Sequence, residues 1–208
     1  MPSYNNLLIP EHYFHVFNRA VGDEKIFRCE ENYHFFLRKF QEYIPPVATL
    51  YCYNLLPNHF HLFLKCKPQE AIETLYVKRK CKPMAKYDNN FISEFIMEQF
   101  SNFFNSYTKS YNKVYNRKRK LFMDRLKRNE VCGDSYYSKI IHYIHTNAVQ
   151  HGYCNHITEW PFSSYHHLIN ENPGSFPAKE IFNWFGGKAG FIKFHNKLYN
   201  AGKNLEGG

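Results

Sequence analysis

The sequence predicts an α+β fold built on a ferredoxin-like split βαβ unit, an antiparallel sheet with helices on one face. Residues 13–20 alternate in the manner of a strand, and residues 30–43 repeat apolar side chains with helical spacing. Residues 47–55 and 59–66 then form two strands around the turn Leu56-Pro57-Asn58. A strand, a helix and a hairpin, in that order, begin a split βαβ unit.

The first three elements have distinct local signals. The strand over residues 13–20 reads YFHVFNRA and is rich in aromatic side chains, which favour strands. The helix over residues 30–43 carries one apolar stripe, made of Tyr33, Phe36, Leu37 and Phe40. Pro45-Pro46 follows it and ends it, because proline cannot continue a helix.

Two helices and one strand are predicted in the second half. Residues 92–116 form a long helix, whose apolar residues recur three and four apart: Ile92, Ile96, Phe100, Phe103, Tyr107 and Tyr111. Residues 121–123 and 125–128 supply the last strand. A helix then opens at Gly133-Asp134-Ser135, runs to about residue 150 and stops at Gly152. We expect the remaining residues to contain only short elements and to end in a disordered glycine-rich stretch.

Composition favours a polyanionic partner. Lys and Arg total 27 against 18 Asp and Glu, a formal net charge of +9, so nucleic acid is the first expectation and an anionic membrane surface the second. No apolar run is long enough to span a bilayer and no signal peptide is recognisable, so we expect a cytoplasmic protein. The six cysteines show no CxxC spacing, which excludes a zinc ribbon and predicts reduced, mostly buried thiols.

The second strand of the hairpin contains two histidines, in the stretch PNHFHLFLK. Side chains alternate across a strand, so His59 and His61 share one face with Phe63 and Lys65, whereas Phe60 and its neighbours form an apolar face. Two imidazoles side by side can ligate one cation. Packed core histidines and coincidence among 12 histidines are the alternative interpretations.

A metal ion needs a further ligand, and the helix over residues 135–150 offers one. Beside its core stripe of Tyr137, Ile140, Ile144 and Ala148 lie three polar residues spaced four apart, which are Lys139, Tyr143 and Asn147. Residues four apart share a helix surface, so a phenol and a carboxamide lie together. We expect both on the lip of a groove, because burying them would require a partner for each.

These residues resemble the single-tyrosine HUH transposases, and within them the REP-associated tyrosine transposases. The resemblance rests on an ordered set of motifs between about residues 11 and 168: FHVFNR at 14–19, HFH at 59–61, NSYTK at 105–109, LF at 121–122, YIHTNAV at 143–149 and WPFSSY at 160–165. It implies an HUH motif on a central strand of the sheet. It also implies a catalytic domain over residues 1–155 and a C-terminal extension over residues 156–208.

The resemblance further implies a transposase that cleaves and rejoins single-stranded DNA near hairpins, as a monomer or homodimer. His59 and His61 would hold a Mg²⁺ or Mn²⁺ ion, Asn147 stands where the family has its third ligand, and Tyr143 stands where the family has its nucleophile. The product of the first step would be a 5′-phosphotyrosine.

Clusters of basic residues are ordinarily solvated surface, but with this net charge we interpret them as phosphate contacts. The predicted DNA-binding residues are Arg19, Lys80, Arg117, Lys118, Lys120, Arg125, Lys127, Arg128 and Lys139.

Two other functions stay open at this point. One is an HUH replication initiator or relaxase, and the other is a non-catalytic nucleic-acid-binding protein on a ferredoxin-like sheet. Tyr107, Tyr111 and Tyr115 are rival nucleophiles, but the first two lie on the apolar stripe of their helix, which favours core packing.

Overall fold

The computed structural model describes residues 5–85, 88–170, 174 and 176–203. It divides into two compact units, of which the first comprises Met1–Leu50 and Leu55–Val131 and the second comprises Tyr51–Asn54 and Cys132–Gly208. The predicted boundary at residue 155 therefore lies inside the second unit. The division into a catalytic domain and an extension stays a prediction about function.

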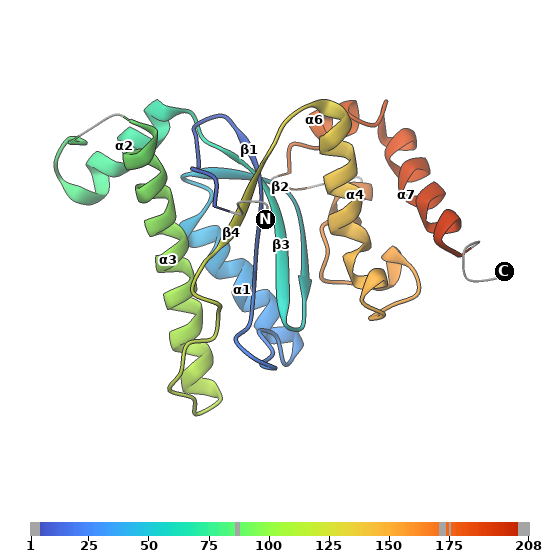
Figure 1. Cartoon of the computed structure of the whole chain (residues 1–208), viewed down its shortest axis with the longest axis horizontal. Helices are drawn as coiled ribbons and strands as arrows, with labels where there is room; N and C mark the ends of the chain where they lie inside the picture. The colour runs from blue at the N-terminus through green and yellow to red at the C-terminus, as the bar shows by residue number, and fades with distance from the viewer. Residues whose placement is uncertain (1–4, 86–87, 171–173, 175, 204–208) are drawn as a thin grey trace. The chain divides into compact units, whose positions relative to one another are not determined.

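Apart from Tyr51–Asn54 of β2, the first unit contains the predicted four-stranded antiparallel sheet, in the order β2-β3-β1-β4 (Figure 1). Its strands are β1 (Tyr13–Arg19), β2 (Ala48–Leu56), β3 (His59–Cys66) and β4 (Lys127–Val131). Strand β1 pairs antiparallel with both β3 and β4. This order is that of the ferredoxin-like fold, and it makes β3 a central strand, so the predicted fold class is confirmed.

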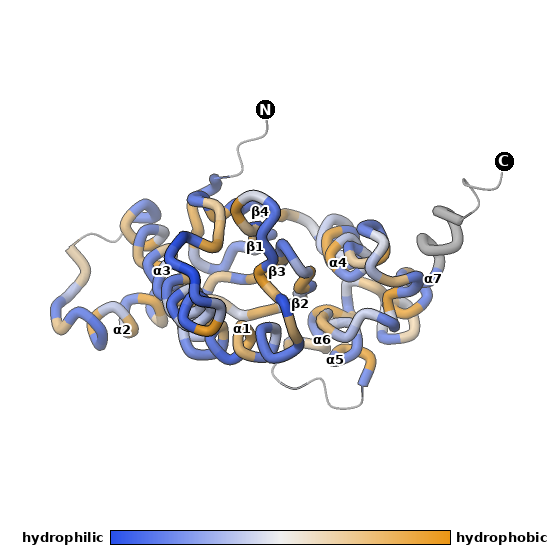
Figure 2. Tube along the Cα trace, turned by 90° about the horizontal axis from the view of Figure 1, so that it is seen from below, coloured by the Kyte–Doolittle hydropathy of each residue, from blue (hydrophilic) through white to orange (hydrophobic). Residues whose placement is uncertain are grey.

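Among the described residues of the first unit, three helices are found: α1 (Glu30–Tyr43), α2 (Gln69–Lys80) and α3 (Asn89–Val114). Phe36 of α1 contacts both Phe60 of β3 and Phe103 of α3, so α1 and α3 cover the apolar face of the sheet together. Figure 2 shows hydrophobic and hydrophilic stretches alternating along these helices, as expected for helices with one buried side.

The second unit contains α4 (Asp134–Gln150), the short helix η1 (Ile157–Glu159), α5 (Tyr165–Ile169), α6 (Ala178–Asn183) and α7 (Lys188–Lys203). Gly133 precedes α4 with φ +90°, a conformation that favours glycine. Tyr51 at the start of the unit donates a hydrogen bond from its hydroxyl to Glu180 of α6 (2.7 Å) and stacks on Trp184.

Several local predictions were wrong. Strand β4 covers Lys127–Val131 and so overlaps the predicted strand only at residues 127–128, and an isolated bridge joins Phe122 to Ala20. The 16-residue helix α7 contradicts a tail of short elements, and the predicted disordered end falls on residues 204–208, outside the described residues. All six cysteines are free, as predicted, but only Cys52 and Cys66 are buried.

In the parts of the chain that the structure describes, no helix combines the length and the apolar character needed to cross a membrane.

Candidate metal and nucleophile site

Strand β3 places His59 and His61 on the face of the sheet opposite Phe60. The pairing with β1 sets Arg19 across from His59, Phe17 across from His61 and His15 across from Phe63. Residues opposite each other in an antiparallel pair project to the same side. The two histidines of β3, which we call the histidine pair, therefore share their face with a third histidine and an arginine.

Hydrogen bonds orient both rings of the histidine pair. The Nδ1 atom of His59 lies 2.7 Å from Oδ1 of Asn58, and Nδ1 of His61 lies 2.9 Å from Nε2 of His15. Because a carboxamide oxygen only accepts, His59 carries its proton on Nδ1 and its lone pair on Nε2. His61 adopts the same tautomer when His15 accepts, so that both Nε2 atoms are chemically able to ligate a cation.

The surroundings of His15 keep its ring neutral, which allows this acceptor role. His15 is 7% exposed and His61 5% exposed, and their rings stack with each other and with Phe17. Burial lowers the pKa of His15 to about 4, so the imidazole is neutral at pH 7 and keeps a lone pair. The sequence motif around residue 15 supported the resemblance, but His15 was not among the predicted site residues.

The donor set fits a divalent cation that has further ligands. The rings of the pair lie 5.2 Å apart and nearly perpendicular, at 88°. Among the described residues, no three His, Cys, Asp or Glu side chains are grouped so as to hold a metal ion. An ion on the histidine pair therefore needs a ligand of another kind, and a carboxamide such as that of Asn147 qualifies.

Helix α4 carries the predicted nucleophile and third ligand. Tyr143 is 38% exposed, as expected, whereas Asn147 is 1% exposed, which contradicts the expectation that it would not be buried. Lys139, one turn before Tyr143, is exposed. The histidine pair belongs to the first unit and these residues to the second, so their meeting around one ion stays a prediction.

A buried histidine network holds α4 inside the second unit. His145 contacts His195 of α7 through Nδ1 (3.0 Å) and Ser164 through Nε2 (2.9 Å). Asn54 donates from Nδ2 to the backbone oxygen of Ile144 (2.8 Å). Because these partners come from three separate segments, α4 and its Tyr143 are firmly placed within their unit. Sequence patterns did not identify these partners.

Two of the three rival tyrosines are packed in the core of the first unit. Tyr107 is fully buried and donates to the backbone oxygen of Ile26 (2.8 Å), and Tyr111 donates to that of Lys25 (2.6 Å). Burial raises the pKa of Tyr107 far above that of a free phenol, which disfavours a phenolate there. The packing interpretation of these two residues is confirmed.

The basic residues predicted to contact phosphates differ in their partners within the protein. Arg117 donates to Glu24 at 2.6 Å, and Lys80 pairs with Glu98 at 2.6 Å. Arg128 donates to the backbone oxygen of Asn6 (2.6 Å), and Lys127 lies over the ring of Phe17. The remaining basic residues of the predicted set are exposed side chains, namely Arg19, Lys118, Lys120, Arg125 and Lys139, of which Lys120 pairs with Asp124.

No protein-family model and no curated protein sequence matches the chain. A solved structure, described as the REP-associated tyrosine transposase bound to a REP hairpin, is similar to it with a TM-score of 0.52 and 16% sequence identity. The match covers 86% of this chain and 90% of that chain. The likeness is one of fold. At that level the resemblance predicted from the motifs is confirmed.

Proposed function

We propose that this protein is a transposase that cleaves and rejoins single-stranded DNA at hairpins, with Tyr143 as nucleophile and a Mg²⁺ or Mn²⁺ ion on His59, His61 and Asn147. One observation carries the proposal most: both imidazoles of the histidine pair are hydrogen-bonded at Nδ1, which suits both Nε2 atoms to ligation. The solved structure with the same fold is that of a transposase bound to a DNA hairpin, which supports the same class of activity and partner.

The proposed ligands determine how firmly the ion is held. Two imidazoles and one carboxamide are all neutral, and Mg²⁺ and Mn²⁺ prefer carboxylate oxygens. We therefore expect weak affinity in the free protein and tighter binding once a DNA phosphate completes the site. When bound, the ion supplies positive charge that offsets the charge of the scissile phosphate and of the departing oxygen.

Tyr143 performs the covalent step in this proposal. Its phenolic oxygen forms a bond to phosphorus while the bond from phosphorus to the 3′ oxygen breaks, which leaves a 5′-phosphotyrosine and a free 3′ hydroxyl. The phenol loses its proton to solvent, and the departing oxygen gains one. A phenol ionises near pH 10, so the ammonium group of Lys139 on the same helix surface assists by favouring the phenolate.

The covalent intermediate stores the energy of the broken phosphodiester. A 3′ hydroxyl of the same or another strand attacks the phosphotyrosine, restores a phosphodiester and releases Tyr143. Rejoining therefore needs no nucleotide cofactor.

Covalent capture of DNA tests the proposal. Labelled single-stranded hairpin DNA incubated with the protein and Mn²⁺ should give an adduct that survives denaturation and is destroyed by protease. Tyr143→Phe should reduce adduct formation at least about a thousandfold, because the attacking oxygen is absent, and chelation of the metal should abolish it. Tyr136→Phe is the matched control, since Tyr136 is an exposed tyrosine on the same helix.

Two outcomes would reject the enzyme. If the wild type and Tyr143→Phe form equal amounts of adduct, Tyr143 is not the nucleophile. If both bind the hairpin and neither forms an adduct, the protein is a non-catalytic DNA-binding protein.

A further inference from the structure

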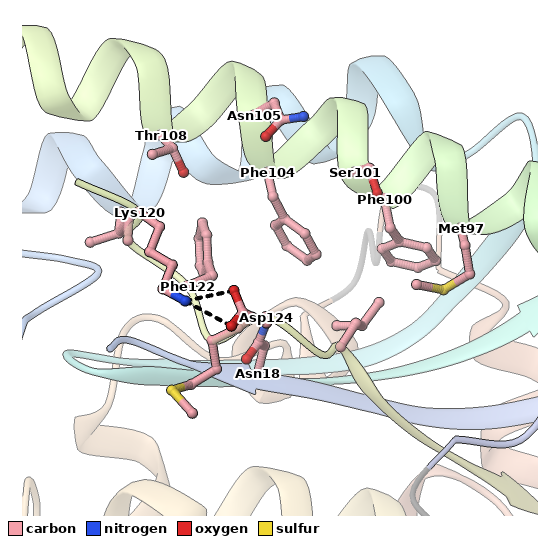
Figure 3. Close-up of a pocket in the computed structure, with 13 residues that line it drawn as sticks. Asn18, Met97, Phe100, Ser101, Phe104, Asn105, Thr108, Lys120, Phe122 and Asp124 are labelled. Carbon is pink, nitrogen blue, oxygen red and sulfur yellow. Dashed lines mark hydrogen bonds and ion pairs between the residues drawn. The ribbon is translucent and has the colours of Figure 1, made fainter. Parts of the chain in front are cut away.

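A pocket of about 290 Å³ lies in the first unit between α3 and the segment 120–126 (Figure 3). The end of β1 closes it through Asn18. In Figure 3, Phe100 and Phe104 point from α3 toward the segment, and Phe122 points back toward α3. The pocket lies wholly within one unit and contains none of the proposed catalytic residues.

The floor of the pocket is aromatic and firmly held. Phe100 and Phe122 are buried, and the half-buried ring of Phe104 lies 4.8 Å from that of Phe122. Two backbone hydrogen bonds fix the segment to the chain at the end of β1, from Met123 N to Arg19 O (2.9 Å) and from Val21 N to Leu121 O (3.0 Å). The side chain of Asn18 adds a third, to the backbone oxygen of Met123 (3.1 Å). The pocket is therefore formed before any ligand arrives.

The rims of the pocket carry hydrogen-bonding groups. Ser101, Asn105 and Thr108 line one rim from a single face of α3, since their spacing of four and three is that of a helix surface. Lys120 and Asp124 line the other rim and pair at 2.7 Å. Three exposed cations flank this rim along the chain, which are Lys118, Arg119 and Arg125.

This combination matches the chemistry of an unpaired nucleobase. Aromatic side chains stack on the face of a base, polar side chains bond its edge, and cations follow the phosphates on either side. The volume suits one base with its sugar, and a base reaches such a pocket when it is single-stranded or extruded.

The end of β1 relates the pocket to the histidine pair. Asn18 lines the pocket, whereas Arg19, the next residue, lies across from His59. Successive residues of a strand face opposite sides of a sheet. A single strand passing the end of β1 can thus place a base in the pocket while a nearby phosphate reaches Arg19 and the histidine pair.

We propose that this pocket binds one unpaired base in the single-stranded flank of the hairpin, stacked on Phe104 and bonded at its edge by Asn105. The assignment rests on the proposed function. It adds a site at which the protein selects the position of cleavage relative to the hairpin.

A double-mutant cycle between protein and DNA tests this site. A pool of hairpins with randomised stems and flanks, enriched for binding to the wild type, provides the probe. Each flanking nucleotide is then replaced in turn by an abasic one, and the dissociation constant is measured for the wild type, Phe104→Leu, Asn105→Ala and the control Asn102→Ala. Asn102 lies on the same helix outside the pocket.

We expect one abasic position to weaken binding by the wild type about tenfold or more. At that position the abasic replacement should weaken binding by Phe104→Leu and by Asn105→Ala less than about twofold, because these variants have already lost the contact with the base. Binding by Asn102→Ala should weaken as much as binding by the wild type. Thermal unfolding of each variant shows whether it is folded.

Two results would overturn the assignment. If the losses of affinity caused by removing the base and by removing the side chain are independent at every position, no base contacts the pocket. This conclusion holds even where the Tyr143 adduct still forms. If enrichment yields no bound hairpin, the proposed function fails and the pocket assignment fails with it.

Discussion

Two groups of histidines, one in each unit, differ in their hydrogen-bond partners. In the second unit the network is closed: Nδ1 of His195 donates to the backbone oxygen of Phe191 (2.9 Å), so its Nε2 accepts from His145, whose own Nε2 accepts from Ser164. In the first unit, Nδ1 of His59 contacts Asn58, and Nδ1 of His61 contacts His15.

The comparison shows that burial and residue type do not separate a structural histidine from a candidate ligand. His61 is 5% exposed and His145 is fully buried, and in the network both nitrogens of His145 and of His195 join segments of the chain. A ligating imidazole needs one nitrogen oriented by the protein and the other able to face an ion. The predictions below test this difference, beginning with the largest expected effect.

Removing the centre of the closed network should destabilise the protein strongly. His145→Ala leaves a cavity and removes the partners of His195 and Ser164, so we expect a loss of about 3–4 kcal/mol in the free energy of unfolding. Urea denaturation measures it, with the exposed His34→Ala as control. The affinity of the folded variant for Mn²⁺ should change less than about threefold, and a larger loss would show that the two groups are not independent.

Removing the partner of His61 should weaken metal binding with a smaller loss of stability. His15→Phe keeps the stacking but removes the acceptor, and we expect Mn²⁺ affinity to fall about 10- to 100-fold. His15→Gln offers an oxygen in its place and should recover part of the affinity. Nitrogen NMR of His61 in the metal-free protein should show the Nδ1-protonated tautomer in the wild type and a mixture in His15→Phe. Equal affinities would contradict a positioning role.

Acid should destabilise the closed network. Burial lowers the pKa of His195 to about 3 and that of His145 well below its usual value. The unfolded chain takes up protons near pH 6.5, whereas these buried rings stay neutral, so stability is full above that pH and falls as the pH drops toward 3.

Between those pH values His195→Phe should reduce the slope of unfolding free energy against pH by up to about 1.4 kcal/mol per unit. Urea titrations at several pH values measure it. An unchanged slope would contradict a buried, neutral His195.

The smallest expected effect concerns the basic side chains. If Arg125 and Lys80 contact phosphates, Arg125→Ala and Lys80→Ala should each lower the slope of log affinity against log salt by about 1. Lys39→Ala, whose side chain pairs with Glu42 on α1, is the control and should leave the slope unchanged. Hairpin binding at several salt concentrations measures these slopes, and equal slopes throughout would remove both residues from the interface.

Much of the fold could be predicted from periodicity. The bounds of α1 and β3 are those predicted, because each has a dense apolar pattern. The predictions missed α2, which buries only Ile72 and Tyr76, and misplaced β4, whose residues KRNEV contain one buried apolar side chain. Strand β4 is defined by its pairing with β1, which no local pattern encodes.

The candidate site was predicted in part. Alternation along one strand is a local property, so it placed His59 and His61 on one face. The contribution of His15 depends on strand register, which brings residues 46 positions apart to hydrogen-bonding distance. The pocket depends in the same way on a segment folding back onto α3 and the end of β1.

By itself the sequence determined which faces of its helices and strands are apolar. It also determined that two histidines lie two residues apart on a strand, and that a tyrosine and a carboxamide lie four residues apart on a helix. Side-chain direction follows from backbone period, so these features need no knowledge of distant contacts. Only the tertiary structure decided which groups form hydrogen bonds with each histidine. That choice depends on the hydrogen-bond partners that folding brings from elsewhere in the chain.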